Sequence, residues 1–289
     1  MKKIVLLLLA IAGLAFGAGF GTSSQEEDKK LINPFNDKEY SFLIGTASES
    51  GTYHKAGTKA ARLLENAVAL STDGSKQNLD LLSEGKINVA FVQGDVYNLE
   101  LSKNPSYANK FTVLLTTRKE FVQLIMRDGM TEDDLQKKGS KVIVGLSKSG
   151  GAGSYLNMQL LEPNYVAEPI FDDVDQLALN ALANKKVDGI IRTSYLEPGD
   201  AFATKVLNTK GLYFADVDDS DLNDKITLNG ETKPIYEFKS VTLEKGMFGK
   251  SAKMLETSVY VVINNELTSR KQRAKIADVL ATYKDSLFQ

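Results

Sequence analysis

The sequence contains no cysteine and no tryptophan, and histidine occurs only once, as His54. The absence of cysteine excludes disulfides, a thiol nucleophile, thiolate metal ligands and a lipidated N-terminal cysteine. A single histidine cannot supply a histidine cluster for zinc, so we expect no metal site and no cofactor. Basic residues are not in excess either. The formal net charge is −2, which indicates no nucleic-acid partner.

The rest of the composition is that of a folded globular protein. Apolar residues make up 43% of the chain and charged residues 25%, which is enough apolar surface for a core and gives no sign of disorder. The length of 289 residues suits two domains of ordinary size.

The N-terminus has the three regions of a secretory signal peptide. Lys2 and Lys3 precede an apolar run at residues 4–14, and small residues follow up to Gly21. We therefore expect residues 1–21 to be a signal peptide, cleaved after Gly17 or in a nearby frame, and residues 22–38 to be a polar tether. An uncleaved membrane anchor is the alternative. A signal peptide predicts a periplasmic, extracytoplasmic location.

Strand-like and helix-like segments alternate in two successive blocks. Strands are expected at residues 40–44, 67–70, 88–92, 112–115, 121–126, 142–146, 187–191 and 257–263. Helices are expected after residue 51, after an N-cap at Ser75, and at residues 128–138, 154–161, 175–183 and 267–287. The recurring order of strand, loop, helix and strand predicts an α/β fold with mainly parallel sheets.

Two short segments, one in each block, align with each other. Residues 82–88 and 182–188 both end an apolar helix, pass through a polar turn and enter a strand. This predicts two lobes built on one plan. We expect residues 39–126 and 241–289 to form lobe I and residues 127–240 to form lobe II. The two crossings between lobes are expected hinges.

Polar, glycine-rich loops follow the expected strands. They lie at residues 45–53, 71–75, 93–95 and 147–154, and they are rich in hydroxyl and backbone N–H donors. In open α/β sheets, ligands bind at the carboxyl ends of strands against helix N-termini. Such loops can also be simple connections, because Gly, Ser and Thr are common turn residues. Four of them together favour a site for an anionic group such as a carboxylate.

The candidate ligand-binding residues come from these loops and from two arginines. They are Ser48, Ser50, Gly51, Tyr53, Ser75, Gln93, Arg118, Ser149, Gly150 and Arg192. The ring of Tyr53 could cover an apolar part of the ligand. The guanidinium groups of Arg118 and Arg192 match a carboxylate, although either could be an ordinary surface residue. We expect Ser149 to bind the ligand and to contribute little to ligand-free stability.

Sharper motifs fail. The glycine spacing of a phosphate loop starts at Gly145, but Gly151-Ala152 stands where Lys-Ser/Thr is required. A dinucleotide fingerprint fails at Leu156, which occupies the third glycine position. No Gly-x-Ser-x-Gly elbow accompanies His54, so no catalytic residue is assigned and we expect no enzyme. The acidic run at residues 216–221 lacks the glycine and the glutamate of an EF-hand.

At these loops the chain resembles the TAXI family of solute receptors of TRAP transporters. The resemblance covers most of the mature chain. It is carried by Ile44-Gly45-Thr46, Gly51-Thr52-Tyr53 with Gly57, residues 72–79, residues 85–95, residues 144–150 and residues 186–189. It implies a type II periplasmic-binding-protein-like fold with an interlobe cleft. It also implies a ligand such as glutamate or a related five-carbon dicarboxylate, and membrane-embedded TRAP subunits as partners. Separately, we expect the protein to be a monomer.

Two other readings remain open. A binding protein of an ABC importer or of a sensor kinase would share the fold and the export signal, and would differ in its docking partner. An extracytoplasmic hydrolase would need a nucleophile with an oriented base, and the sequence offers none.

Overall fold

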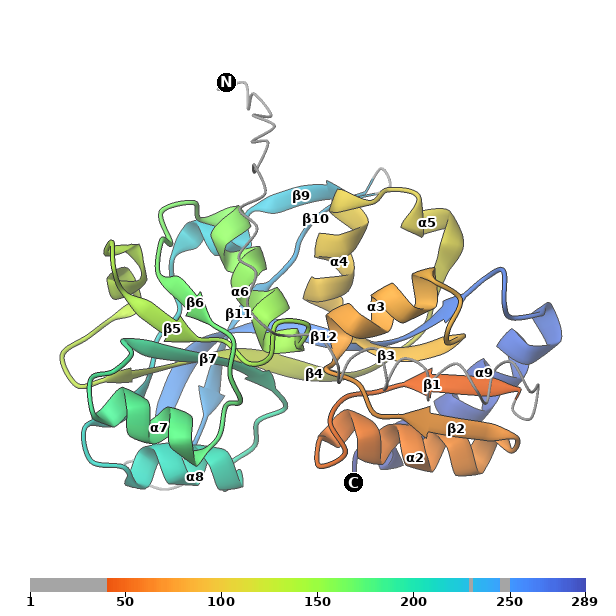
Figure 1. Ribbon diagram of the computed structural model, residues 1–289, viewed down its shortest axis with the longest axis horizontal. Coiled ribbons are helices and arrows are strands. Elements are labelled where there is room, and N and C mark those ends of the chain that lie inside the picture. The colour runs from red at the N-terminus through yellow and green to blue at the C-terminus, as the bar shows by residue number, and fades with distance from the viewer. Residues whose placement is uncertain (1–40, 229–230, 245–249) are drawn as a thin grey trace, which may run out of the picture.

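The computed structural model describes residues 41–228, 231–244 and 250–289, which form two lobes (Figure 1). The predicted signal peptide and tether lie outside these described residues. Within them, no helix combines the length and the apolar character needed to cross a bilayer.

Lobe I is built around a parallel sheet of three strands. β1 (Phe42–Gly45) pairs in parallel with β2 (Ala67–Leu70) and with β3 (Val89–Gln93). Four helices accompany these strands and a fifth comes from the end of the chain: α2 (Thr52–Leu64), α3 (Ser75–Ser83), α4 (Gly94–Lys103), α5 (Tyr107–Lys110) and α9 (Arg270–Thr282). All side chains of β1 and β3 are buried, as expected for strands covered by helices on both faces.

Lobe II repeats this order. β5 (Lys141–Ile143) pairs in parallel with β6 (Glu168–Ile170) and with β7 (Gly189–Ser194). The remaining elements here are α6 (Gly150–Leu161), α7 (Gln176–Ala183), α8 (Ala201–Asn208), β8 (Leu212–Ala215), β11 (Glu237–Thr242) and the hairpin of β9 (Lys225–Leu228) and β10 (Glu231–Pro234). Three 3₁₀ turns complete the described chain: η1 (Glu132–Gln136), η2 (Ser220–Asn223) and η3 (Lys284–Ser286).

Two long antiparallel strands run through both lobes and join them (Figure 1). β12 (Ser251–Asn264) pairs with β3 in lobe I and with β11 in lobe II, while β4 (Phe111–Arg127) pairs with β7 and β8 in lobe II. All the strands except β9 and β10 therefore belong to one ten-stranded sheet. This two-lobed α/β arrangement confirms the predicted type II periplasmic-binding-protein-like fold class.

Each of the two long strands, β4 and β12, contributes residues to the hydrophobic cores of both lobes. Leu115 and Val259 pack in the core of lobe I, whereas Val122 and Leu255 belong to that of lobe II. The lobe boundaries predicted at 126/127 and 240/241 stay a prediction. The prediction of two separate strands at 112–115 and 121–126 is wrong, because β4 is continuous. The polar residues 116–120 look like a loop in sequence, but they are the part of β4 that passes between the lobes.

Several local expectations are also corrected. Residues 128–138 contain the 3₁₀ turn η1 instead of an α-helix, and the C-terminal helix α9 is shorter than predicted. α6 begins at Gly150, earlier than expected. Ser75 is not an N-cap: it is the first residue of α3, which has Gly74 at its N-cap. The hydroxyl of Ser75 instead accepts a hydrogen bond of 3.0 Å from the backbone N–H of Gln93.

The repeat predicted from sequence has the same geometry in both lobes. After α3 and after α7, the backbone turns through positive φ, at Gly85 (74°) and at Lys185 (60°). Asn88 then accepts a hydrogen bond from Leu43 N–H of β1, and Asp188 accepts one from Lys141 N–H of β5, each at 2.9 Å. The two side chains therefore tie equivalent strands together in the two lobes.

Candidate functional site

A cavity of about 230 Å³ lies between the lobes. Lobe I lines it with the β1–α2 loop, the β2–α3 loop and the end of β3, and lobe II lines it with the β5–α6 loop, the β6–α7 loop and β7. Glu120 of the crossing strand β4 also lines it. These are the carboxyl ends of parallel strands, where sequence reasoning placed the ligand.

Eight of the ten predicted site residues line this cavity. They are Ser48, Gly51, Tyr53, Ser75, Gln93, Ser149, Gly150 and Arg192. Ser50 and Arg118 are not among its lining residues; Ser50 is exposed, and Arg118 lies beside a second cavity. The structure therefore brings most of the predicted set together, and direct ligand contact by each residue stays a prediction.

The N-termini of α2 in lobe I and α6 in lobe II meet at the cavity. α2 begins after Gly51, which supplies no side-chain cap, so its first N–H groups remain available as donors. α6 begins after Ser149, whose hydroxyl accepts a hydrogen bond of 3.3 Å from Ala152 N–H. Ser149 is therefore a helix cap as well as a cavity residue. The partial positive charges of the helix ends favour an anionic group between them.

Arg192 is the only cationic side chain among the described residues that line the cavity. Its Nη1 lies 3.2 Å from Gln123 Oε1 and 3.9 Å from Asp200 Oδ1, and its guanidinium stacks 4.4 Å from the ring centroid of Phe202. Burial lowers the pKa of Arg192, but a guanidinium stays charged in proteins. The Arg192 guanidinium, positioned by Gln123, Asp200 and Phe202, is a planar group suited to bind a carboxylate.

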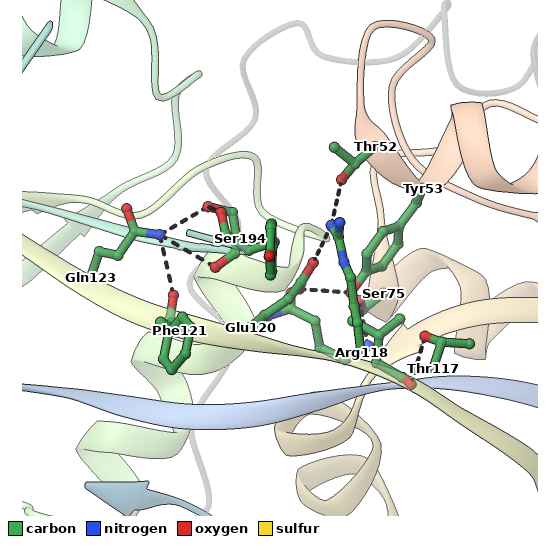
Figure 2. A network of polar contacts seen from close by, with 12 residues as sticks. Thr52, Tyr53, Ser75, Thr117, Arg118, Glu120, Phe121, Gln123 and Ser194 are labelled. Atoms are coloured by element: carbon green, nitrogen blue, oxygen red, sulfur yellow. Dashed lines mark hydrogen bonds and ion pairs between the residues drawn. The ribbon is translucent and has the colours of Figure 1, made fainter. Parts of the chain in front are cut away.

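Arg118 already has a carboxylate partner, Glu120 (Figure 2). Arg118 Nη2 lies 3.0 Å from Glu120 Oε1, and the Tyr53 hydroxyl donates to Glu120 Oε2 at 2.9 Å. Burial raises the pKa of Glu120, while Arg118 and Tyr53 act against this shift. The Arg118 guanidinium also stacks between the rings of Phe288, at 4.0 Å, and Tyr195, at 5.0 Å. Arg118 thus pairs with a neighbour on its own strand β4, and its role as a ligand clamp stays a prediction.

Sequence reasoning missed several polar residues of the cavity. Thr52 and Asp73 lie inside loops that had been singled out, and Thr193 and Ser194 directly follow an expected strand, so position could have indicated all four. Glu120 gave no such signal, because its place depends on the course of β4 between the lobes.

A buried carboxylate network lies behind the cavity, where α4 packs against α6. Asp95 of α4 accepts hydrogen bonds from Ser154 Oγ at 2.5 Å and from Tyr236 Oη at 2.9 Å. Thr193, which lines the cavity, donates to Ser154 Oγ at 2.8 Å. Burial raises the pKa of Asp95, and the hydrogen bonds from Ser154 and Tyr236 lower it by less. The network ties lobe I to lobe II.

The single histidine is not among the described residues that line the cavity. Nδ1 of His54, the single histidine, lies 3.0 Å from Thr46 Oγ1, but Thr46 is fully buried and neither residue lines the cavity. Elsewhere, the carboxylates of Glu162, Asp219 and Asp221 lie within 4.8 Å of one another. Asp219 there accepts the N–H of Asp221 and caps η2, which is a structural role.

Residues 44–259 match the model of the NMT1-like family. No curated protein matches the sequence. Among solved structures, XAC2383 from Xanthomonas citri, bound to ATP, is 9% identical with a TM-score of 0.54; the match covers 83% of this chain and 82% of that one. This likeness concerns the fold alone.

Two further structures match over similar shares of the chain. The GluR0 ligand-binding core from Nostoc punctiforme, in complex with L-glutamate, is 14% identical with a TM-score of 0.47, and the match covers 86% of this chain and 97% of that one. A putative L-cystine ABC transporter from Listeria monocytogenes is 14% identical with a TM-score of 0.49, and the match covers 86% and 92%.

Proposed function

The chain belongs to the NMT1-like family, and on this basis we propose that it is an extracytoplasmic solute-binding protein that captures a small carboxylate metabolite between its lobes. The observation that carries the proposal is the convergence of the α2 and α6 N-termini with Arg192 and the Gln93 amide on one interlobe cavity. All of these groups donate hydrogen bonds, so the complementary ligand is rich in acceptors and anionic.

The resemblance to the TAXI family supports a finer version of the proposal. The ligand is then glutamate or a related five-carbon dicarboxylate, and the monomeric receptor delivers it to membrane-embedded TRAP subunits. A cavity of about 230 Å³ is of a size for a metabolite of this class and offers no space for a large one. An ABC importer or a sensor kinase remains the alternative partner, because such a partner would use the same fold.

A binding role is favoured over catalysis by the chemistry of the cavity wall. Three carboxylates, those of Asp73, Glu120 and Asp173, are among its described lining residues, and Glu120 is held by Arg118 and Tyr53. Hydrolysis would require a nucleophile activated by a base. In this proposal the ligand leaves the protein chemically unchanged.

Ligand class is tested by thermal unfolding and calorimetric titration of the mature chain. The test compounds are glutamate, glutamine, 2-oxoglutarate and 2-hydroxyglutarate, with a neutral sugar and a divalent metal as controls. A true ligand at a hundredfold excess over Kd stabilises the folded state by about 2.7 kcal/mol. A shift with the sugar or metal and with none of the carboxylates would refute the carboxylate proposal.

Two further measurements test whether the bound compound stays unchanged and whether the protein is exported. Mass spectrometry after incubation with the bound compound should recover it unchanged; a product would support an enzyme instead. The mass of the protein from the native cell envelope should lack about the first 17 to 21 residues, as expected for a cleaved signal peptide. An intact mass that includes Met1 would argue for the uncleaved anchor.

Co-purification from the native envelope tests the partner. Recovery of TRAP subunits would support the TAXI version of the proposal, and recovery of ABC or kinase subunits would support the alternative.

A further inference from the structure

Gln93 combines deep burial with an unused hydrogen-bond donor. It ends β3 in lobe I, lines the interlobe cavity, and has only 3% of its surface exposed. Its backbone N–H is satisfied by the Ser75 hydroxyl at 3.0 Å. In the part of the chain that the structure describes, its side-chain Nε2 is buried and has no partner. A buried donor without an acceptor is costly, and few such groups persist in folded proteins without a role.

The same side chain lies against lobe II. Gly150 is the first residue of α6, and a Cβ atom built on it would lie 1.2 Å from Gln93 Oε1 and 2.4 Å from its Cδ. The backbone of Gly150 does not have a positive φ, so glycine is needed there for space and not for conformation. Gln93 therefore occupies the room that the missing side chain of Gly150 leaves.

The neighbouring contacts show that this is a close meeting of the two lobes. A Cβ on Gly74 of lobe I would lie 3.3 Å from the Cα of Ser149, the residue before Gly150. The amide of Gln93 is thus held between the end of β3 and the start of α6. Gln93 also lines the cavity, where Arg192 is the only cation among the described lining residues.

We propose that Gln93 is a specificity-determining residue that couples ligand recognition to lobe closure: seated on Gly150, it donates from Nε2 to a carboxylate oxygen of the ligand. This inference rests on the proposed solute-binding function and adds the group that reads the ligand. A ligand that presents a donor at this point, such as an amide N–H₂, leaves Nε2 unsatisfied. Only a ligand with an acceptor there completes the contact between the lobes.

A double-mutant cycle tests the coupling. Calorimetry with glutamate and 2-oxoglutarate should show that Gln93→Ala weakens binding by about 10- to 100-fold, the range for a hydrogen bond to a charged group. Gly150→Ala should weaken it comparably, because its methyl group displaces the Gln93 amide. The double variant should bind no worse than Gln93→Ala alone, because the methyl group at position 150 then meets no Gln93 amide. Gln159→Ala, in α6 but outside the cavity, should keep the wild-type affinity.

Additive losses in the cycle, or an unchanged affinity of Gln93→Ala, would overturn the proposal while leaving carboxylate binding intact. If the wild type binds no carboxylate, the proposed function fails. The contact between Gln93 and Gly150 is then tested on the ligand-free protein, through the distance between the lobes. Spin labels on cysteines introduced at the exposed Arg62 and Lys205 report the distance between lobes. Gly150→Ala should lengthen that distance, and adding Gln93→Ala should restore it. No difference among the variants would overturn the coupling.

Discussion

The backbone carbonyl of Lys148 in lobe II accepts a hydrogen bond of 3.1 Å from the backbone N–H of Lys76 in lobe I. The next N–H along α3, that of Gln77, points to the same oxygen at 3.4 Å. The first N–H groups of a helix have no partner inside the helix. α3 therefore has its N-terminus capped by the other lobe, and this cap exists only while the lobes are together.

Hydrogen exchange should report this cap. We expect the amides of Lys76 and Gln77 to exchange more slowly when glutamate saturates the protein, because binding favours the closed lobes and keeps their acceptor in place. The amide of Lys55 is a control, since its acceptor, the Gly51 carbonyl, lies in the same lobe. Equal slowing at all three amides would indicate general stabilisation and not a cap across the lobes.

Ser149→Ala should lower ligand-free stability, contrary to the expectation from sequence. The hydroxyl caps α6 through Ala152 N–H, and loss of such a cap costs about 1 kcal/mol. Ser269→Ala is the matched control, because Ser269 caps α9 in the same way far from the cavity. Urea unfolding should show similar losses for both variants. Calorimetry should show weaker ligand binding for Ser149→Ala alone; equal affinities would make Ser149 purely structural.

Arg192→Lys should weaken carboxylate binding by about tenfold or more, because lysine keeps the charge and loses the planar fork. Arg127→Lys is the control. Arg127 also sits in lobe II with carbonyl and carboxylate partners, including Asp188 at 3.0 Å, but it does not line the cavity. We expect this variant to lose stability and keep its affinity in calorimetric titration. Unchanged affinity in Arg192→Lys would remove the guanidinium from the site.

The stability of the protein should depend on pH through Asp95. Burial raises its pKa above the ordinary 3.8, so at pH values between the unfolded-state and the folded-state pKa the folded state holds a proton that the unfolded state has released. The free energy of unfolding contributed by this group therefore falls as pH rises through the folded-state pKa. Asp95→Asn removes the titration, and its stability should improve relative to wild type over that pH range.

Asp134 provides the opposite control for this pH series. Burial acts to raise its pKa, but hydrogen bonds from Lys137 and from Thr131 N–H outweigh burial and lower it. Its contribution is present above the unfolded-state pKa and is lost as pH falls. Asp134→Asn should therefore lose stability relative to wild type as pH rises. Urea unfolding at constant ionic strength measures both; parallel curves for wild type and Asp95→Asn would contradict the Asp95 assignment.

The parts of the fold that local pattern controls were predictable from sequence. The turns at Gly85 and Lys185 each follow the apolar end of a helix and each lead into a strand, so their equivalence was visible in sequence as a repeat. The loops at strand ends were visible too, since hydroxyls and glycines concentrate there. This is why most predicted site residues line one cavity.

What sequence could not provide depends on contacts between distant segments. The polar residues around Glu120 interrupt an apolar run and resemble a loop in sequence, because their pairing with the distant strand β12 leaves no local signal. The partner of Arg118 was equally hidden, because a guanidinium suits a ligand carboxylate as well as it suits Glu120. The contact between Gln93 and Gly150 joins residues of different lobes, so no local sequence pattern could indicate it.

The long pairing of β4 with β12 determines the mechanics of the molecule. The two strands are hydrogen-bonded to each other on both sides of the crossing, from Leu255 with Val122 to Asn264 with Phe111. The register shifts between Ser258 and Tyr260 and again between Val261 and Val262. Sliding one lobe past the other would break this register at every step. Bending or twisting the ribbon at these two irregular points would keep most of the pairing on either side of them, and bulges locally increase twist. We therefore expect the lobes to move by bending or twisting of this ribbon at Ser258–Val262, so the stiffness of that short stretch would oppose closure on a ligand.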